Sequence, residues 1–146
     1  NKKGFLKMKI AVVYWSSTGN TEAMAQAVVE GAKRAGAEAE LFTDTEFDGG
    51  KMDEFDAVAF GCPAMGAEEL EDGEFAPMFE TCESKLSGKK IALFGSYGWG
   101  DGEWMRTWEE NCRDKGANLV CDSVICQETP DDEALSACRS LGEALA

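Results

Sequence analysis

The sequence contains no histidine, and this absence removes several kinds of functional site at once. Zinc sites that combine cysteine with histidine are excluded, and so are the Ser-His-Asp and Cys-His arrangements of nucleophilic catalysis. The six cysteines form no C-x-x-C pair and show no iron–sulfur spacing. We therefore expect no metal site and no chemistry that depends on an imidazole side chain.

The chain also lacks any apolar stretch that approaches the length of a bilayer span. Its first seven residues are basic but have no apolar signal core, so secretion is not supported. This segment precedes Met8, and we interpret residues 1–7 as an upstream or artificially added segment. Residues 8–146 are then expected to form one domain, which is long enough to bury a proper core.

Positive charge is scarce, with 14 basic residues against 28 acidic ones and a net charge of −14. A surface of this sign repels nucleic acids and anionic membranes, and it attracts proteins that carry basic patches. The alternative, that the acidity only keeps the protein dissolved, follows equally well from the composition.

The cysteines are even in number, so a disulfide framework has to be considered. Several of them lie within apolar runs, however, and the chain is not a small, loop-rich scaffold. We therefore expect free, buried thiols in a reducing cytosol, and hence a cytoplasmic protein.

Apolar segments alternate with segments of helical periodicity along the whole chain. Near-continuous apolar strands separated by helices indicate a parallel sheet covered on both faces, which predicts a single doubly wound α/β domain. Residues 43–54 are too polar to assign and could form a short helix or a loop. The predicted strands are 9–15, 38–42, 55–61, 90–95 and 119–124, and the predicted helices are 21–35, 74–86, 103–115 and 131–145.

The segment W-S-S-T-G-N-T-E, residues 15–22, joins the first predicted strand to the first predicted helix. A strand, a tight loop and a helix direct backbone N–H groups and the helix dipole at an anion. The segment has no lysine and lacks the G-x-x-x-x-G-K-[ST] spacing, so a magnesium–nucleoside triphosphate is not expected. It favours a single terminal phosphate on a tightly held cofactor, with a turn rich in helix N-cap residues as the alternative.

Two further loops follow strands at the carboxyl edge, where ligands of such sheets bind. One comprises residues 63–69, and the other is the glycine-rich stretch 96–104. An aromatic side chain on a glycine-rich loop is suited to stacking against a flat ring. The spacing differs from the G-x-G-x-x-G dinucleotide fingerprint. Trp104, Met105 and Trp108 have helical spacing beyond this loop, and we assign them mainly to core packing.

Three motifs together, T-G-N-T, A-M-G-x-E and S-Y-G-W-G-D-G-E-W, resemble those of a flavodoxin in order and spacing. The resemblance runs from about residue 8 to the C-terminus. It is greatest to the short-chain type of anaerobic bacteria, because the last strand lacks the insertion of the long-chain type.

The resemblance implies a flavodoxin-like fold, with a five-stranded parallel sheet in the order 2-1-3-4-5 and helices on both faces. It also implies an electron-transfer protein, not an enzyme, that binds FMN non-covalently and cycles mainly between semiquinone and hydroquinone at low potential. The implied partners are redox enzymes with basic docking surfaces, namely reductase-type donors and low-potential acceptors, and we expect a monomer.

The resemblance also assigns roles to residues. The 16–21 loop would hold the FMN phosphate, Met65 and Trp99 would sandwich the isoalloxazine, and Glu68 would accept a hydrogen bond from flavin N3–H. Ser96 and the 127–130 stretch would lie near the ribityl chain. The complete set of expected FMN-binding residues is Ser16, Ser17, Thr18, Gly19, Asn20, Thr21, Ala64, Met65, Gly66, Ala67, Glu68, Ser96, Tyr97, Gly98, Trp99, Gly100 and Gln127.

Gly66 has the most specific implied role, because the peptide after it is expected to turn its carbonyl towards protonated flavin N5. A type II′ turn needs positive φ at its first central residue, which glycine supplies freely. The alternative type II turn needs positive φ at Ala67, which costs a residue with a Cβ about 1–2 kcal/mol. We therefore hypothesise that Ala67 biases the loop towards the carbonyl-up arrangement.

Two alternatives remain at this stage. One is an FMN-dependent NAD(P)H:quinone or nitro reductase on the same fold, which would need a nicotinamide or quinone site. The other is a response-regulator domain, which shares the strand order but needs an acidic cluster after the first strand, where this chain has serine and threonine.

Overall fold

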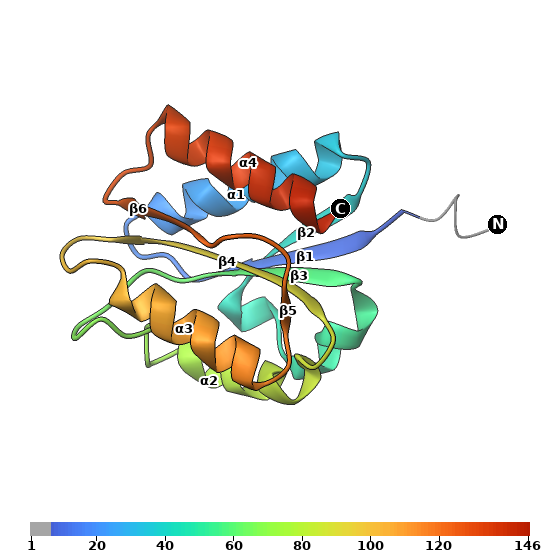
Figure 1. The fold of residues 1–146 in the computed structure, drawn as a ribbon, viewed down its shortest axis with the longest axis horizontal. Helices are drawn as coiled ribbons and strands as arrows, with labels where there is room; N and C mark the ends of the chain where they lie inside the picture. Colours follow the sequence, from blue (N-terminus) through green and yellow to red (C-terminus); the bar gives the residue numbers. More distant parts are fainter. Residues whose placement is uncertain (1–6) are drawn as a thin grey trace.

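The computed structural model describes residues 7–146 and shows a parallel sheet between two layers of helices (Figure 1). Most of the segment interpreted as lying upstream, residues 1–6, is outside the described residues. The strands are β1 (Lys9–Tyr14), β2 (Glu38–Thr43), β3 (Ala57–Gly61), β4 (Lys90–Tyr97), β5 (Asn118–Leu119) and β6 (Val124–Gln127), and the α-helices are α1 (Asn20–Arg34), α2 (Phe75–Cys82), α3 (Glu103–Asp114) and α4 (Asp132–Leu145).

The central strands are buried on both faces, as their apolar runs predict. In β1, Ala11 and Val13 face a core beneath α2 and α3, whereas Ile10 and Val12 face a second core beneath α1 and α4. This alternation follows from the two-residue period of a strand. The two cores explain why the strand sequences show continuous hydrophobicity rather than an apolar–polar alternation.

The sheet has the order β2-β1-β3-β4-β5, which confirms the predicted order 2-1-3-4-5. All pairings are parallel, so the carboxyl ends of the strands meet at one edge. In the register of the three central strands, Tyr14 of β1 lies opposite Gly61 of β3, and Gly61 lies opposite Phe94 of β4. The loops after β1, β3, β4 and β6 are consequently brought together at that edge.

The predicted last strand, 119–124, is wrong in its bounds, because two short strands occupy this position. Both β5 and β6 pair with β4, through Ile91–Leu119 and Phe94–Val124. The segment between them leaves the ladder after the N–H of Val120 donates to the Ile91 carbonyl at 3.1 Å. Just before β6 begins, Ser123 Oγ donates to the Glu109 carboxylate of α3 at 2.5 Å.

Helix ends follow the sequence signals closely. After α1, Gly36 adopts φ 95°, and the N–H of Ala37 reaches the Ala32 carbonyl at 3.0 Å, which is a Schellman ending. The predicted helix 74–86 is present as α2 followed by a short 3₁₀ turn, η4 (Glu83–Lys85). The unassigned residues 43–54 form two more 3₁₀ turns, η2 (Asp44–Glu46) and η3 (Gly49–Glu54).

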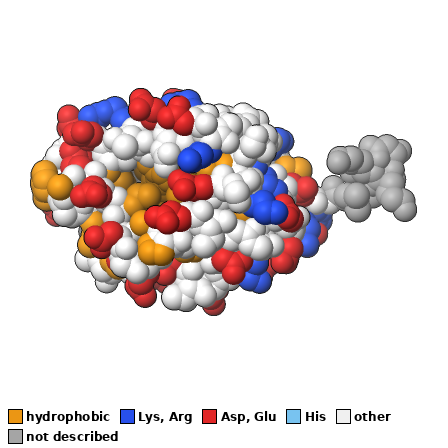
Figure 2. All heavy atoms as spheres, turned by 90° about the horizontal axis from the view of Figure 1, so that it is seen from below, with side chains coloured by type: hydrophobic (Ala, Val, Ile, Leu, Met, Phe, Trp, Pro, Cys, Tyr) orange, Lys and Arg blue, Asp and Glu red, His pale blue; other side chains and the backbone are white. Residues whose placement is uncertain are grey.

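Helices α1 and α4 cover one face of the sheet and approach each other closely (Figure 1). A Cβ built on Gly142 would lie 2.0 Å from the Val28 carbonyl oxygen, and a Cβ on Gly31 would lie 1.9 Å from that of Arg139. Only glycine fits these two positions without moving a helix. The opposite face, covered by α2 and α3, shows a hollowed apolar strip bordered by acidic side chains (Figure 2).

All six cysteines are free, as predicted. Cys62, Cys82, Cys112 and Cys138 are buried, whereas Cys121 and Cys126 are only partly buried, so the expectation of buried thiols is correct for four of the six. Burial raises the pKa of the Cys82, Cys112 and Cys138 thiols to about 12. Among residues 7–146, none of the helices has the length and apolar character needed to cross a bilayer.

Candidate functional site

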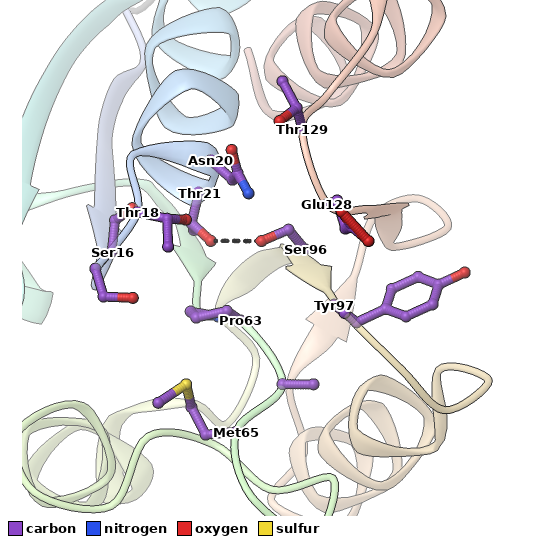
Figure 3. A pocket seen from close by; sticks show the side chains of 13 residues that line it. Ser16, Thr18, Asn20, Thr21, Pro63, Met65, Ser96, Tyr97, Glu128 and Thr129 are labelled. Carbon is purple, nitrogen blue, oxygen red and sulfur yellow. Dashed lines mark hydrogen bonds between the residues drawn. The ribbon is translucent and has the colours of Figure 1, made fainter.

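A cavity of about 330 Å³ lies at the carboxyl ends of the strands, where the loops after β1, β3, β4 and β6 converge (Figure 3). Its position is the one predicted for ligands of a doubly wound sheet. The lining contains hydroxyl, amide and apolar side chains and one carboxylate, but neither lysine nor arginine. The lining residues are Ser16, Ser17, Thr18, Asn20, Thr21, Pro63, Ala64, Met65, Ser96, Tyr97, Gly98, Glu128 and Thr129.

The loop between β1 and α1 forms one wall of the cavity. Gly19 is the N-cap of α1 with φ 93°, a conformation that favours glycine. Its N–H donates to Ser16 Oγ at 3.1 Å, which closes the loop, and its carbonyl accepts the first helical bond from Ala23 at 3.0 Å. The amino end of the 15-residue helix α1 therefore meets this wall, and its dipole favours a bound anion.

Thr21 and Ser96 are the two buried polar residues of the described core, with 1% and 5% of their surface exposed. Their hydroxyl oxygens are 3.3 Å apart, although the residues are separated by 75 positions in the sequence (Figure 3). The contact joins the start of α1 to the end of β4 and leaves each hydroxyl oxygen with further capacity for hydrogen bonding.

The loop after β3 forms a tight turn beside the cavity. The N–H of Met65 donates to the Glu69 carbonyl at 2.7 Å, and the N–H of Glu69 donates back at 3.0 Å. Between them Gly66 has φ 53° and Glu68 has φ 56°, whereas Ala67 has no positive φ. Positive φ at Gly66 and not at Ala67 is the combination that the type II′ hypothesis requires. Met65 is 37% exposed and lines the cavity with its thioether (Figure 3).

Glu68 holds a carboxylate oxygen, Oε1, that is buried without a hydrogen-bond partner. A carboxylate is an acceptor only, so this oxygen fits a ligand that presents an N–H or O–H donor. Asp101 and Glu103 bring carboxylate oxygens within 4.8 Å of that of Glu68, and Arg106 offsets part of this charge through a 3.0 Å contact with Asp101. These three carboxylates make the edge of the site strongly acidic.

The loop after β4 presents one aromatic residue to solvent and anchors another. Trp99 is 65% exposed, whereas Tyr97 packs against Trp104 with ring centroids 5.6 Å apart. The Gly98 carbonyl accepts a bond from Gln127 Nε2 at 3.2 Å, which ties this loop to the end of β6. Trp99 is thus available for stacking at the rim of the cavity.

The structure brings ten of the expected site residues together around the cavity. The other seven, Gly19, Gly66, Ala67, Glu68, Trp99, Gly100 and Gln127, lie in the adjoining loops and not in the lining. Pro63 lines the cavity but was not among the expected site residues, although it opens the 63–69 loop that was predicted to lie at this edge. Glu128 and Thr129 also line it; only the resemblance pointed to the 127–130 stretch, because the last strand was predicted to end at residue 124. The assignment of Trp104, Met105 and Trp108 to the core is confirmed.

Comparison with known proteins relates the chain to one family over almost its full length. The family model for flavodoxin matches residues 12–142. The flavodoxin of Megasphaera elsdenii is 47% identical over 94% of this chain and 98% of its own length, and that of Clostridium beijerinckii is 43% identical over 92% and 97%. The solution structure of the two-electron reduced Megasphaera elsdenii flavodoxin superimposes with a TM-score of 0.85, at 45% identity, over 93% of this chain and 97% of that one.

Proposed function

Because this chain belongs to the flavodoxin family and is an FMN-binding electron carrier, we propose that the carboxyl-edge cavity is its FMN site. The observation that carries this proposal is the neutral cradle at the amino end of α1. Serine, threonine and asparagine side chains line it without a single basic residue. Such a cradle holds a phosphate by backbone dipoles and hydroxyl donors.

The chain's own groups divide between the two ends of the FMN. Ser16, Ser17, Thr18, Asn20 and Thr21 would hold the phosphate, together with the backbone of Gly19. Ser96 at the end of β4 and Glu128 and Thr129 after β6 line the same cavity and would contact the ribityl chain.

The isoalloxazine ring would lie between the loops that follow β3 and β4. Met65 supplies a polarizable thioether and Trp99 an exposed indole, both suited to contact with a flat ring. The buried, unpartnered Oε1 of Glu68 would accept the flavin N3–H, which satisfies an oxygen that is otherwise costly to bury. Because a carboxylate oxygen can only accept a hydrogen bond, this unpartnered acceptor fits the N–H donor at the edge of a flavin ring.

Bound FMN supplies one-electron chemistry, whereas the protein supplies binding and electrostatic control. Glu68, Glu69, Asp72 and Asp101 place negative charge beside the ring site, and this charge would oppose the negative charge that the flavin ring acquires on full reduction. This arrangement supports a low second reduction potential. Thr21 and Ser96 are buried at the other end of the site, so their hydroxyls are held in fixed positions for the phosphate and the ribityl chain, respectively.

The protein passes electrons between redox proteins, as flavodoxins do. The net charge of −14 supports partners that carry basic docking surfaces, because opposite charges raise the rate of encounter. We include a monomeric state and a cytoplasmic location in the proposal; free thiols at all six cysteines support the latter.

The test compares FMN with riboflavin, which lacks the phosphate, by quenching of flavin fluorescence on titration into FMN-free protein. Replacement of Thr21 by Val is expected to weaken the binding of FMN by roughly threefold to tenfold, which corresponds to the loss of one hydrogen bond. The binding of riboflavin should change less. Thr107→Val is the matched control, since Thr107 is exposed on α3 and outside the cavity. Equal losses for the two ligands, or equal losses in the two variants, would contradict the assignment.

A further inference from the structure

Cys62 lies where the two loops of the proposed ring site begin. It directly follows β3 and is fully buried, and its N–H donates to the Phe94 carbonyl of β4 at 3.1 Å. Two residues later, the N–H of Ala64 donates to the Ser96 carbonyl at 3.0 Å. The pairing of the two strands therefore continues past the end of β3, and the loops that follow them leave the sheet side by side.

The thiol of Cys62 closes the loop after β3. Its sulfur accepts the N–H of Glu71 at 3.4 Å, and its S–H donates to the Pro63 carbonyl at 3.6 Å. Burial raises the pKa of this thiol, so it stays protonated at neutral pH and can make both contacts. Within residues 7–146 the contact with sulfur is the one hydrogen bond made by the Glu71 N–H, and it joins residues nine positions apart.

The closed loop contains the turn that carries Met65. Met65 and Glu69 exchange two backbone hydrogen bonds, which hold the two sides of the turn together. Two residues further on, the Glu71 carboxylate accepts three N–H groups at the start of α2. The Cys62 thiol therefore ties the base of the Met65 turn to both the end of β3 and the start of α2.

The carbonyl of Cys62 anchors the other loop, which follows β4. It accepts the indole N–H of Trp104 at 3.1 Å, and Trp104 is only 2% exposed. Gly95 of β4 provides the space for this bond, because a Cβ there would lie 2.2 Å from the Cys62 carbonyl oxygen and 3.2 Å from Trp104 Cζ2. The indole thus holds the end of the glycine-rich loop that presents Trp99.

We propose that Cys62 is a positioning residue for the flavin, because its thiol and its carbonyl hold the two ring-binding loops at a fixed separation. Cys62, Glu71 and Trp104 form this contact, which we call the Cys62 junction. Met65 and Trp99, which would contact the two faces of the ring, lie on the two loops that it joins. A flavin that had to order loosely held loops would lose affinity to that ordering. The proposal rests on the proposed FMN site, since it specifies how the ring end of that site is held.

Replacement of Cys62 by Ala tests the thiol. Flavin fluorescence on titration into FMN-free protein should show that FMN and riboflavin both bind roughly threefold to tenfold more weakly, which corresponds to one hydrogen bond. The factor should be the same for both ligands, because the junction acts on the ring and not on the phosphate. Cys112→Ala is the matched control, since Cys112 is a fully buried free cysteine of α3 outside the cavity. Equal affinities in the two variants, or a loss specific to FMN, would overturn the proposal.

Replacement of Cys62 by Ser separates the hydrogen bond from packing. The hydroxyl can accept the Glu71 N–H, so this variant should recover part of the flavin affinity that Cys62→Ala loses. It should not gain stability over Cys62→Ala, because a buried hydroxyl costs more to remove from water than a methyl group does. Urea unfolding measures the stability of the parent protein and the two variants. Flavin affinity that simply follows the free energy of unfolding would overturn the proposal.

Replacement of Trp104 by Phe tests the carbonyl half of the junction. Phenylalanine keeps an aromatic ring in the core but leaves the Cys62 carbonyl without its donor, so both flavins should again bind roughly threefold to tenfold more weakly. Trp108→Phe is the matched control on the same helix. Trp108 is 3% exposed and its indole N–H has no acceptor among the described residues, so its loss breaks no hydrogen bond. Equal affinities in the two variants would overturn the role of Trp104.

The comparison with Thr21→Val keeps the two proposals apart. That variant should weaken FMN more than riboflavin, whereas Cys62→Ala should weaken both ligands equally. A Thr21→Val protein that loses the two ligands equally would refute the proposed FMN site. If Thr21→Val behaves as expected and Cys62→Ala binds flavins as tightly as Cys112→Ala, only the proposal for the Cys62 junction is refuted.

Discussion

The carboxylate of Glu68 lies directly against Gly100. A Cβ built on Gly100 would come within 2.6 Å of the Glu68 Cδ and within 2.8 Å of both carboxylate oxygens. Gly100 also has φ 90°, which L-residues rarely adopt. The glycine therefore provides the space in which the carboxylate is held, and the loops after β3 and β4 are fitted to each other at this point.

Replacement of Gly100 by Ala should consequently do two things. The positive φ should destabilise the fold by about 1–2 kcal/mol, and the clash should displace the Glu68 carboxylate and weaken FMN binding. Urea unfolding and fluorescence titration measure the two effects. Gly36→Ala is the control, because Gly36 also has positive φ but has open space around its Cβ position and lies outside the cavity. It should lose stability without losing FMN affinity, and an equal loss of FMN affinity in the two variants would argue against a specific role for Gly100.

Replacement of Glu68 by Gln should raise the second reduction potential of bound FMN. The amide keeps an oxygen that can accept the flavin N3–H, but it removes the negative charge that opposes charge on the reduced cofactor. At an effective dielectric constant near that of a protein surface, the change should be on the order of tens of millivolts. Redox titration followed by visible absorbance measures it, with Glu40→Gln on β2 as the distant control. A fall in the second potential would contradict the expectation.

Replacement of Ala67 by Gly should make the first reduction potential more negative. In the structure Gly66 has positive φ and Ala67 does not, and the alternative type II turn would require positive φ at Ala67, which a residue with a Cβ disfavours. Glycine removes that penalty of about 1–2 kcal/mol and lets the oxidised protein populate the other turn, which amounts to tens of millivolts at most. The same titration serves as the readout. A first potential that is unchanged or more positive would disprove the role of Ala67.

Glu71 should make the stability of the protein depend on pH through its contacts in the 71–75 segment. Partial burial alone would raise the pKa of this carboxyl, but the backbone N–H groups of Phe75, Glu74 and Gly73 bond to it at 2.7, 2.8 and 2.9 Å and hold the pKa below its usual value. The resulting stability is present above the unfolded pKa of about 4.3 and is lost as pH falls through the lower, folded pKa.

Glu71→Gln should therefore lower the free energy of unfolding by about 0.5–1 kcal/mol at pH 7, the size of a lost helix cap. At a pH below the folded pKa, the variant and the parent protein should be equally stable. Urea unfolding at the two pH values gives the comparison, and Glu80→Gln, which alters an exposed carboxylate of α2 without a described side-chain bond, is the control. A loss that is the same at both pH values would show that the carboxylate charge is not responsible.

The sequence predicted the sheet order and the position of the site because both depend on strong, local signals. Strands such as β1 and β3 are buried on both faces, so their apolar runs are unambiguous. Parallel pairing then brings the loops after them to one edge, whichever residues those loops contain. The hydroxyl-rich 16–21 loop at the start of a helix was recognisable for the same reason.

The remaining features depend on contacts between distant residues. Val120 and Cys121 have a strand-like pattern, yet residues 120–123 lie outside the strands, and Ser123 bonds to Glu109 of the distant helix α3. The positive φ of Glu68 could not be predicted from the sequence, because glutamate seldom adopts this conformation. A groove of about 460 Å³ lies between α3 and the 68–76 segment, which are separated by about 30 residues in the chain, and only the fold brings them together.

The split of the last strand has a consequence for self-association. An uninterrupted outer strand offers a neighbouring molecule a row of unpaired backbone groups, and such rows template aggregation. Here that margin consists of two residues in β5 and four in β6, with a break between them. The other margin, β2, carries Glu38 and Glu40 with exposed side chains. Neither side of the sheet is a good template, so a carrier that must meet and leave its partners repeatedly is protected from adhering to copies of itself.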